Sequence, residues 1–250
     1  MKGMIFAAGL GTRLAPLTDT IPKALVEVGG QTMLERAIRR LTDAGVTEIT
    51  VNTHHFADMV EEYLEGHDGF GAHITISRES DRLLDTGGGV VAAGRWLTAP
   101  PDEPIMLYNA DILTDFDINA MLGAHLRSGA DATLLVSDTR KSTRGLIFGP
   151  DGRMAGWTNL QTGEVRAPRP LPEGAKVMPF GGVHIISPRL IADMEEYGRE
   201  RDGVFSLTPF YTAVCGARDL HAYLPESPYR WIDIGKPETL ALARELFEAD

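Results

Sequence analysis

A glycine-rich segment follows the first apolar stretch of the chain. Residues 7–14 read A-A-G-L-G-T-R-L and come directly after an apolar run. Glycines in such a turn let backbone N–H groups approach phosphate oxygens, and Arg13 adds a planar guanidinium that matches phosphate geometry. The segment lacks the third glycine of a dinucleotide-binding motif, because Leu14 stands there, and it lacks the Gly-Lys-Ser/Thr of a Walker loop. A plain connection is the alternative interpretation, and Arg13 favours an anion site.

A second cation lies in the sequence I-P-K-A-L of residues 21–25. Pro22 restricts the backbone, and the ammonium group of Lys23 projects from an otherwise apolar stretch. A surface lysine is the alternative interpretation. Together with Gly11 and Arg13, Lys23 predicts a local positive pocket.

Two aspartates stand at the ends of apolar stretches. Asp111 follows the apolar residues 104–108, and Asp233 lies within W-I-D-I-G-K-P at residues 231–237. A carboxylate among apolar residues is costly unless it is paired or bound to a metal. Two carboxylates beside a triphosphate would suit Mg²⁺, which takes oxygen ligands and bridges phosphates. Either Asp111 or Asp115 could instead cap a helix that begins at residue 118, and Asp115 is the better candidate for the cap.

The elements that must position these residues alternate along the first half of the chain. The hydrophobic pattern predicts strands at residues 4–8, 48–52, 74–77, 104–108 and 132–136, and helices at residues 34–41, 59–64, 89–97 and 118–127. Such alternation is typical of a mostly parallel sheet with helices on both faces. Ligands bind such a sheet at the carboxyl ends of its strands, where the glycine segment and Asp111 stand.

The pattern changes after residue 138. We expect a hairpin over residues 146–157, a Pro/Gly-rich stretch over 162–179, a strand at 183–186 and a closing helix at 237–247. No stretch has the composition of a linker. The prediction is therefore one domain over residues 1–250, in which residues 139–250 add a substrate-facing layer to residues 1–138.

The composition limits the classes of partner. The chain has 250 residues and a net charge of −11, from 35 acidic and 24 basic residues. Such an acidic surface does not favour nucleic acid polymers. The single cysteine forms no internal disulfide, and no apolar run approaches the roughly 20 residues of a membrane span. We therefore expect a cytoplasmic protein without nucleic acid or membrane partners, and no segment predicts its oligomeric state.

The motifs closely resemble those of the sugar-1-phosphate nucleotidyltransferases, the nucleoside-diphosphate-sugar pyrophosphorylases. The family signature G-x-G-T-R-(L/M)-x-P-L-T, followed by P-K-(P/A)-(L/M), matches residues 9–18 and 22–25, and further matches lie at residues 84–89, 109–111, 180–183 and 231–237. The resemblance implies a Rossmann-like mixed, mostly parallel sheet flanked by helices, the nucleotide-diphospho-sugar transferase fold. It also implies that a nucleoside triphosphate and a sugar 1-phosphate are joined with release of pyrophosphate, with Mg²⁺ as cofactor.

The resemblance also implies roles for individual residues. Residues 1–138 would bind the nucleotide and residues 139–250 would bind the sugar and close the site. The catalytic residues would be Arg13 on the leaving phosphates, Lys23 on the phosphates of both reactants, and Asp111, which would hold Mg²⁺ with Asp233. The nucleotide would be wrapped by Ala8, Gly9, Gly11, Thr12 and Arg13, with the backbone of Gly87 and Gly88 on the base. The sugar would be contacted by Asn109, Asp138, Gly145 and Asn159.

Within the family, the length and the D-T-G-G-G segment most resemble the N-acetylmuramate α-1-phosphate uridylyltransferases of peptidoglycan recycling. The mannose-1-phosphate guanylyltransferases are the alternative, and a catalytically silent homologue that binds nucleotide sugars is an alternative from a different class. Intact Arg13, Lys23, Asp111 and Asp233 argue against a silent homologue. The chain departs from the family pattern at Ala110, and at residues 157–159, where W-T-N replaces a segment that carries a sugar-contacting acid in relatives.

Overall fold

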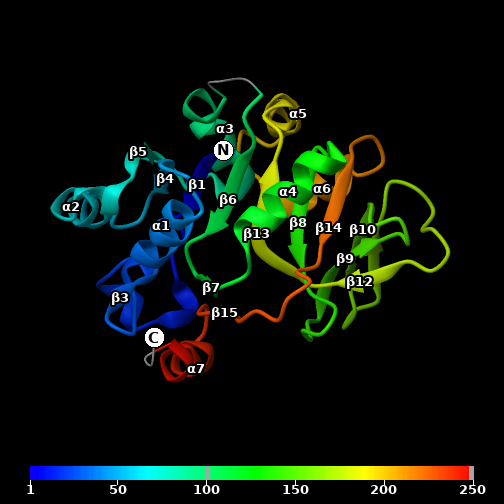
Figure 1. Cartoon of the computed structure of the whole chain (residues 1–250). Coiled ribbons are helices and arrows are strands. Elements are labelled where there is room, and N and C mark those ends of the chain that lie inside the picture. The colour runs from blue at the N-terminus through cyan, green and yellow to red at the C-terminus, as the bar shows by residue number, and fades with distance from the viewer. Residues whose placement is uncertain (99–101, 248–250) are drawn as a thin grey trace.

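The computed structural model describes residues 1–98 and 102–247, and its centre is a seven-stranded sheet (Figure 1). The strand order is β14-β8-β13-β6-β1-β4-β5. β13 runs antiparallel to its neighbours β6 and β8, while the other pairs are parallel. This arrangement confirms the predicted mixed, mostly parallel sheet. The strands are β1 (Lys2–Phe6), β4 (Glu48–Thr53), β5 (His73–Arg78), β6 (Ile105–Asn109), β8 (Ala132–Val136), β13 (Phe180–Ile186) and β14 (Leu220–Tyr223).

Helices cover both faces of this sheet because successive side chains of each buried strand point to opposite sides. Met4 belongs to one core cluster and Ile5 to another, and both side chains are inaccessible to solvent. The cluster of Met4 contains apolar residues of α3 (Asp85–Leu97), α5 (Arg189–Arg199) and α6 (Leu207–Val214). The cluster of Ile5 contains those of α1 (Met33–Asp43), α2 (Ala57–Gly66) and α4 (Ile118–Ser128).

A smaller antiparallel sheet lies beside the β14 edge of the large one (Figure 1). Its strand order is β11-β10-β9-β12, and its central pair, β9 (Arg144–Phe148) and β10 (Met154–Asn159), is the predicted hairpin. The outer strands, β11 (Glu164–Arg166) and β12 (Lys176–Met178), form inside the Pro/Gly-rich stretch and were not predicted. Each has three residues and pairs only with the hairpin, so its local sequence carries little strand signal.

Two short ribbons complete the sheet structure. β2 (Glu27–Val28) pairs with β3 (Gln31–Thr32), and β7 (Ile112–Thr114) pairs antiparallel with β15 (Trp231–Asp233). The closing helix, α7 (Pro237–Phe247), follows β15 and packs on a third apolar cluster that includes Leu113 and Ile232 of this ribbon. This packing places the C-terminal part of the chain next to the residues that follow β6.

Two local expectations were wrong. The helix that carries the glycine run begins at Asp85 rather than at residue 89, so the glycines lie inside its first turns. The cap of α4 is Asp117, whose side chain accepts a hydrogen bond from the N–H of Ala120 at 2.9 Å. Asp115 instead pairs with Arg230 at 2.7 Å. Asp117 is placed immediately before the first helical residue, which is where a side-chain oxygen can reach a free N–H of the first turn. Among the described residues, no helix has both the length and the apolar character needed to cross a membrane.

Candidate active site

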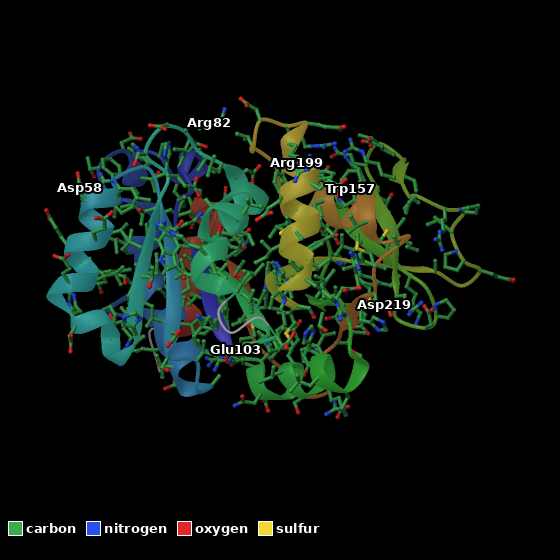
Figure 2. The ribbon with its side chains drawn as sticks, turned by 90° about the horizontal axis from the view of Figure 1, so that it is seen from above. Asp58, Arg82, Glu103, Trp157, Arg199 and Asp219 are labelled. Atoms are coloured by element: carbon green, nitrogen blue, oxygen red, sulfur yellow. The ribbon has the colours of Figure 1, made fainter. Side chains whose placement is uncertain are left out.

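Two adjoining hollows open at the carboxyl ends of the central strands. The smaller, of about 180 Å³, lies where β1, β4 and β6 end, and it is lined by the predicted residues Ala8, Gly9, Lys23, Asn109 and Asp111. The larger, of about 1200 Å³, extends toward the small sheet and is lined by Arg13, Gly145, Asn159 and Asp233. In Figure 2, Trp157, another lining residue, lies on the small-sheet side of α5. Most of the residues selected from the sequence thus gather around one connected region.

The glycine segment owes its shape to Gly11. Its φ of +67° is in the left-handed region, and a Cβ there would lie 2.9 Å from Thr18 Cγ2 and 3.1 Å from Lys23 Cβ. Thr18 Oγ1 donates to the carbonyl of Gly11 at 2.9 Å. A single 3₁₀ turn then carries Thr12 and Arg13, both exposed. Only glycine fits this bend without strain, so the bend aims Arg13 at the larger hollow.

Lys23 and Asp111 form an ion pair in the wall of the smaller hollow. Lys23 Nζ contacts Asp111 Oδ2, and the two side chains are 11% and 24% exposed. The contact joins the segment after the glycine loop to the residues that follow β6. A half-buried cation at this point is well placed to meet a phosphate as well as the carboxylate.

Asp233 is brought to Asp111 by the β7–β15 ribbon. Asp233 pairs with Ile112, the residue after Asp111, and the N–H of Ile234 donates to the carbonyl of Asp111 at 3.1 Å. The N–H of Gly235 donates to Asp233 Oδ1 at 2.6 Å. A Cβ on Gly235 would lie 2.7 Å from both Asp233 Oδ1 and Arg13 Nη2. Arg13 and Asp233 therefore flank the same glycine.

The two aspartates fit a magnesium ion. Within residues 1–98 and 102–247, Asp111 Oδ1 and Asp233 Oδ2 receive no hydrogen bond, so each carboxylate keeps one oxygen available. No group of three or more His, Cys, Asp or Glu side chains able to hold a metal gathers in this part of the chain. Mg²⁺ commonly binds one or two carboxylates and completes its shell with water and phosphate oxygens. A pair of aspartates beside a phosphate site has this chemistry.

Gly87 and Gly88 do not offer their N–H groups to a ligand. Both N–H groups donate to the carbonyl of Phe205, at 2.8 and 3.2 Å. A Cβ on Gly87 would come within 2.2 Å of the Phe205 ring, and one on Gly88 within 2.2 Å of the carbonyl of Gly203. Their N–H groups are therefore engaged within the protein, and the contact of their backbone with the base stays a prediction. Their role is to let residues 203–205 cap the first turn of α3.

Two further contacts between residues 202–207 and the residues around the start of α3 lie at the rim of the site. Arg82 pairs with Asp202 at 2.6 Å, and the N–H of Leu207 donates to Thr86 Oγ1 at 3.0 Å. In Figure 2, Arg82 lies at the outer edge of the molecule near the end of α5. The segment after α5 is thus fixed to the segment before α3, and this link joins the walls of the two hollows.

Asp138 lies outside the hollows that hold the other predicted residues. Its side chain is exposed and lines neither hollow, whereas the following residues 140–146 line the larger one. Asn159 lines it from the end of β10, but its Oδ1 accepts from the N–H of Gln161 at 3.0 Å. Within the described residues, the amide nitrogen of Asn159 donates no hydrogen bond. Gly145 lies against β12, where a Cβ would be 2.5 Å from Val177 Cγ1.

A buried polar chain that the sequence analysis did not select supports the glycine segment. Asn52 Oδ1 accepts from the N–H of Ala7 at 2.9 Å, and Asn52 Nδ2 donates to Glu79 Oε1 at 2.8 Å. Glu79 Oε2 accepts from the N–H of Leu84 at 2.7 Å. Glu79 is 4% exposed, and burial raises the pKa of its carboxyl. The available signal was the amide residue Asn52 near the end of a predicted strand.

Three further cations line the larger hollow. Arg140, Lys141 and Arg144 lie between Asp138 and Gly145, and the sequence analysis passed over them. The available signal was the density of positive charge, with three cations among five consecutive residues. A carboxylate also enters this wall, because Glu164 of β11 pairs opposite Asn159 and lines the same hollow. The neighbouring strand thus places a carboxylate opposite Asn159, although residues 157–159 themselves carry none.

Comparisons with known proteins agree with this site. Residues 2–152 match the nucleotidyl transferase family. The chain is 32% identical to the N-acetylmuramate alpha-1-phosphate uridylyltransferase of Caulobacter vibrioides, over 98% of this chain and 97% of that protein. It is 36% identical to the mannose-1-phosphate guanyltransferase of Gibberella zeae, over 58% of this chain and 39% of that protein. The fold is also that of the crystal structure of HddC from Yersinia pseudotuberculosis complexed with GMP-PN, with a TM-score of 0.75, 22% identity and coverage of 98% and 99% of the two chains.

The family match covers the strands that carry the glycine segment, Lys23 and Asp111, and the full-length similarity extends to Asp233 and the small sheet. The chain therefore belongs to the nucleotidyl transferase family, and it is a sugar-1-phosphate nucleotidyltransferase.

Proposed function

We propose that the protein transfers a uridylyl group from UTP to N-acetylmuramate 1-phosphate and releases pyrophosphate, in peptidoglycan recycling. The observation that carries nucleotidyl transfer is that the Lys23–Asp111 ion pair of the smaller hollow lies next to Asp233 of the larger one. The choice of substrates is supported by the similarity to the Caulobacter vibrioides enzyme over nearly the full length of both proteins.

The reaction requires one bond to form and one to break. An ionised oxygen of the sugar 1-phosphate attacks the α-phosphorus in line, and the bond from the α-phosphorus to the bridging oxygen breaks as pyrophosphate leaves with the electron pair. The attacking oxygen carries no proton, so this step needs no general base. Catalysis then consists of positioning the two anions and stabilising their charge.

Each residue of the site has a role in this positioning and charge stabilisation that follows from its place. Arg13 stabilises the leaving phosphates, and Lys23 holds the α-phosphate beside the sugar phosphate. Mg²⁺, held by Asp111 and Asp233, would neutralise charge on the triphosphate. Ala8 and Gly9 form the floor of the nucleotide site in the smaller hollow. The N–H groups of Gly87 and Gly88 already donate to the carbonyl of Phe205. We therefore assign the remaining wall of the nucleotide site to Leu83, Asp85 and Thr86.

A second candidate, transfer of a guanylyl group to mannose 1-phosphate, is favoured by the match to the Gibberella zeae enzyme. That match spans 58% of this chain. A catalytically silent homologue is opposed by the presence of all four charged residues, Arg13, Lys23, Asp111 and Asp233.

A substrate matrix tests the proposal. Purified protein is incubated with UTP, GTP or dTTP and with the 1-phosphates of N-acetylmuramate, N-acetylglucosamine, mannose or glucose, in Mg²⁺, and pyrophosphate release is measured. We expect the highest kcat/KM with UTP and N-acetylmuramate 1-phosphate, and no release after chelation of Mg²⁺. Turnover confined to GTP and mannose 1-phosphate would replace the first candidate by the second, and no turnover with any pair would favour the silent homologue.

A further inference from the structure

The larger hollow contains more positive charge than one sugar phosphate needs. Its charged lining residues are six cations, Arg13, Arg140, Lys141, Arg144, Arg166 and Lys236, and two acids, Glu164 and Asp233. Glu164 is paired with Arg166 at 2.7 Å, and Asp233 lies beside Arg13. Within the described residues, none of the three cations of residues 140–144 forms an ion pair with a protein carboxylate.

Arg140 is the member of this group that the fold holds in place. Its Nη2 donates to the carbonyl of Phe180 at 2.6 Å, and its Cζ lies 3.5 Å from the centroid of the Trp231 ring. The ring is itself fixed, because Trp231 Nε1 donates to the carbonyl of Gly181 at 2.8 Å. Burial lowers the pKa of Arg140, but an arginine remains charged at neutral pH.

The fixed guanidinium still has donors to offer. Nη2 makes the one hydrogen bond found for this side chain within residues 1–98 and 102–247, so its second N–H is still available to form a two-bond fork with a neighbouring N–H of the guanidinium. A planar guanidinium held in one orientation binds a carboxylate through two parallel hydrogen bonds at low entropic cost. Arg144 begins β9 in the same wall, directly opposite Asn159 on β10.

We propose that Arg140, assisted by Arg144, recognises a carboxylate on the sugar ring, so that the enzyme selects acidic sugar 1-phosphates. This inference rests on the proposed nucleotidyl transfer and assigns residues to its sugar selectivity. N-acetylmuramate differs from N-acetylglucosamine by one lactyl ether, which carries a carboxylate, so the two 1-phosphates form a matched pair. A neutral sugar would leave the three cations without an anion, which disfavours its binding.

The test measures kcat/KM with UTP for both sugars in the wild type and in three variants. Arg140→Gln and Arg144→Gln remove a cation from the hollow, and Lys176→Gln removes an exposed cation of the same small sheet that does not line it. For Arg140→Gln we expect a loss of at least about tenfold with N-acetylmuramate 1-phosphate, as for a charged hydrogen bond. With N-acetylglucosamine 1-phosphate we expect a change below about threefold, because that sugar lacks the bonded group. Arg140→Lys should recover part of the loss, since it keeps the charge without the planar fork.

Equal losses with both sugars would overturn the inference, since Arg140 would then bind the phosphate they share, while the proposed function would stand. A wild-type preference for a neutral sugar or for a sugar bisphosphate would also overturn it. Glucuronic acid 1-phosphate and glucose 1-phosphate form a second matched pair. The wild type could use glucuronic acid 1-phosphate instead of N-acetylmuramate 1-phosphate, and Arg140→Gln could lose that activity. This result would support the recognition of a carboxylate and would exclude N-acetylmuramate 1-phosphate as the substrate.

Discussion

Asp111 and Asp233 come from distant parts of the chain, and an antiparallel ladder holds them on neighbouring strands. The N–H of Ile234 donates to the carbonyl of Asp111 at 3.1 Å, and Asp233 pairs with Ile112. Lys23 contacts the first of these carboxylates and Arg13 lies beside the second. Two carboxylates and two cations therefore lie close together, and such groups can stabilise the charge of phosphates and of a metal ion.

The aspartate pair should act as a unit. Asp111→Asn and Asp233→Asn each remove one charged oxygen ligand, so we expect kcat to fall by about 10²–10³-fold in either variant. The double variant should lose little more than either single one, because groups that act together are not additive. Pyrophosphate release measured across a Mg²⁺ titration checks this. Asp117→Asn keeps the cap of α4 and serves as the control, and wild-type activity in either test variant would remove the metal assignment.

Lys23 should be needed for its charge and for its shape. Lys23→Met leaves Asp111 without its partner and the phosphates without a cation, so kcat/KM should fall by about 10²–10³-fold. Lys23→Arg should recover little, because the broad guanidinium replaces a compact ammonium in a side chain that is 11% exposed. Steady-state kinetics with both substrates measure the effect. A small change confined to KM would indicate that Lys23 contributes to binding alone.

Gly235 should tolerate no side chain. A Cβ there would lie 2.7 Å from Arg13 Nη2 and from Asp233 Oδ1, so Gly235→Ala should displace both groups. We expect kcat to decrease at least about tenfold with a Tm change of a few degrees, because the added methyl group meets the ends of two side chains that can shift. Gly66→Ala, at a glycine with no heavy atom within 4 Å, is the control for activity and Tm. An active Gly235→Ala enzyme would show that Arg13 can be displaced without loss.

The buried series of hydrogen bonds that joins Ala7, Asn52, Glu79 and Leu84 should stabilise the protein. Asn52→Ala leaves the N–H of Ala7 and the Oε1 atom of Glu79 without a partner, at a cost of about 1–3 kcal/mol in the free energy of unfolding. Urea unfolding measures this cost. The KM for the nucleotide should rise as well, because Ala7 leads into the glycine segment. Thr42→Ala, which removes an exposed hydroxyl, is the control, and an equal loss of stability in both variants would contradict the role of Asn52.

His184 should make stability depend on pH. The side chain is 1% exposed, neither ring nitrogen has a hydrogen-bond partner within the described residues, and burial lowers its pKa to about 3. Between the ordinary pKa of 6.5 and this value, the unfolded chain binds a proton that the folded chain does not. The free energy of unfolding should therefore fall as the pH falls below about 6.5, by roughly 1.4 kcal/mol per pH unit for this group.

His184→Phe tests that dependence. The phenyl ring can pack against Phe180 and Tyr211, which already contact the imidazole, and it takes up no proton. The variant should be more stable than the wild type at pH 5, and the difference should shrink above pH 7. His125, whose pKa burial lowers to about 4, remains in both proteins and contributes equally. Parallel curves of unfolding free energy against pH would contradict the assignment.

The core of the site could be predicted because its signals are local. The glycine segment and Lys23 lie within one short stretch, and the strands that carry Asp111 and its neighbours are continuous apolar runs. The sheet followed from the alternation of such runs with amphipathic helices. β11 and β12 could not be predicted, because each is stabilised by pairing with the β9–β10 hairpin rather than by its own residues.

The amino-acid sequence by itself determined the family, the central sheet and the charged residues that we expect to bind phosphate. The tertiary structure decided how the glycines of α3 are used, because the carbonyl that occupies Gly87 and Gly88 belongs to Phe205, far along the chain. It also decided that Asp233 lies beside Asp111, that Glu164 lies opposite Asn159, and that Arg140 is fixed on Trp231. In each case the physical reason is the same: the partner is brought close by strand pairing or loop docking between distant segments, which no local pattern records.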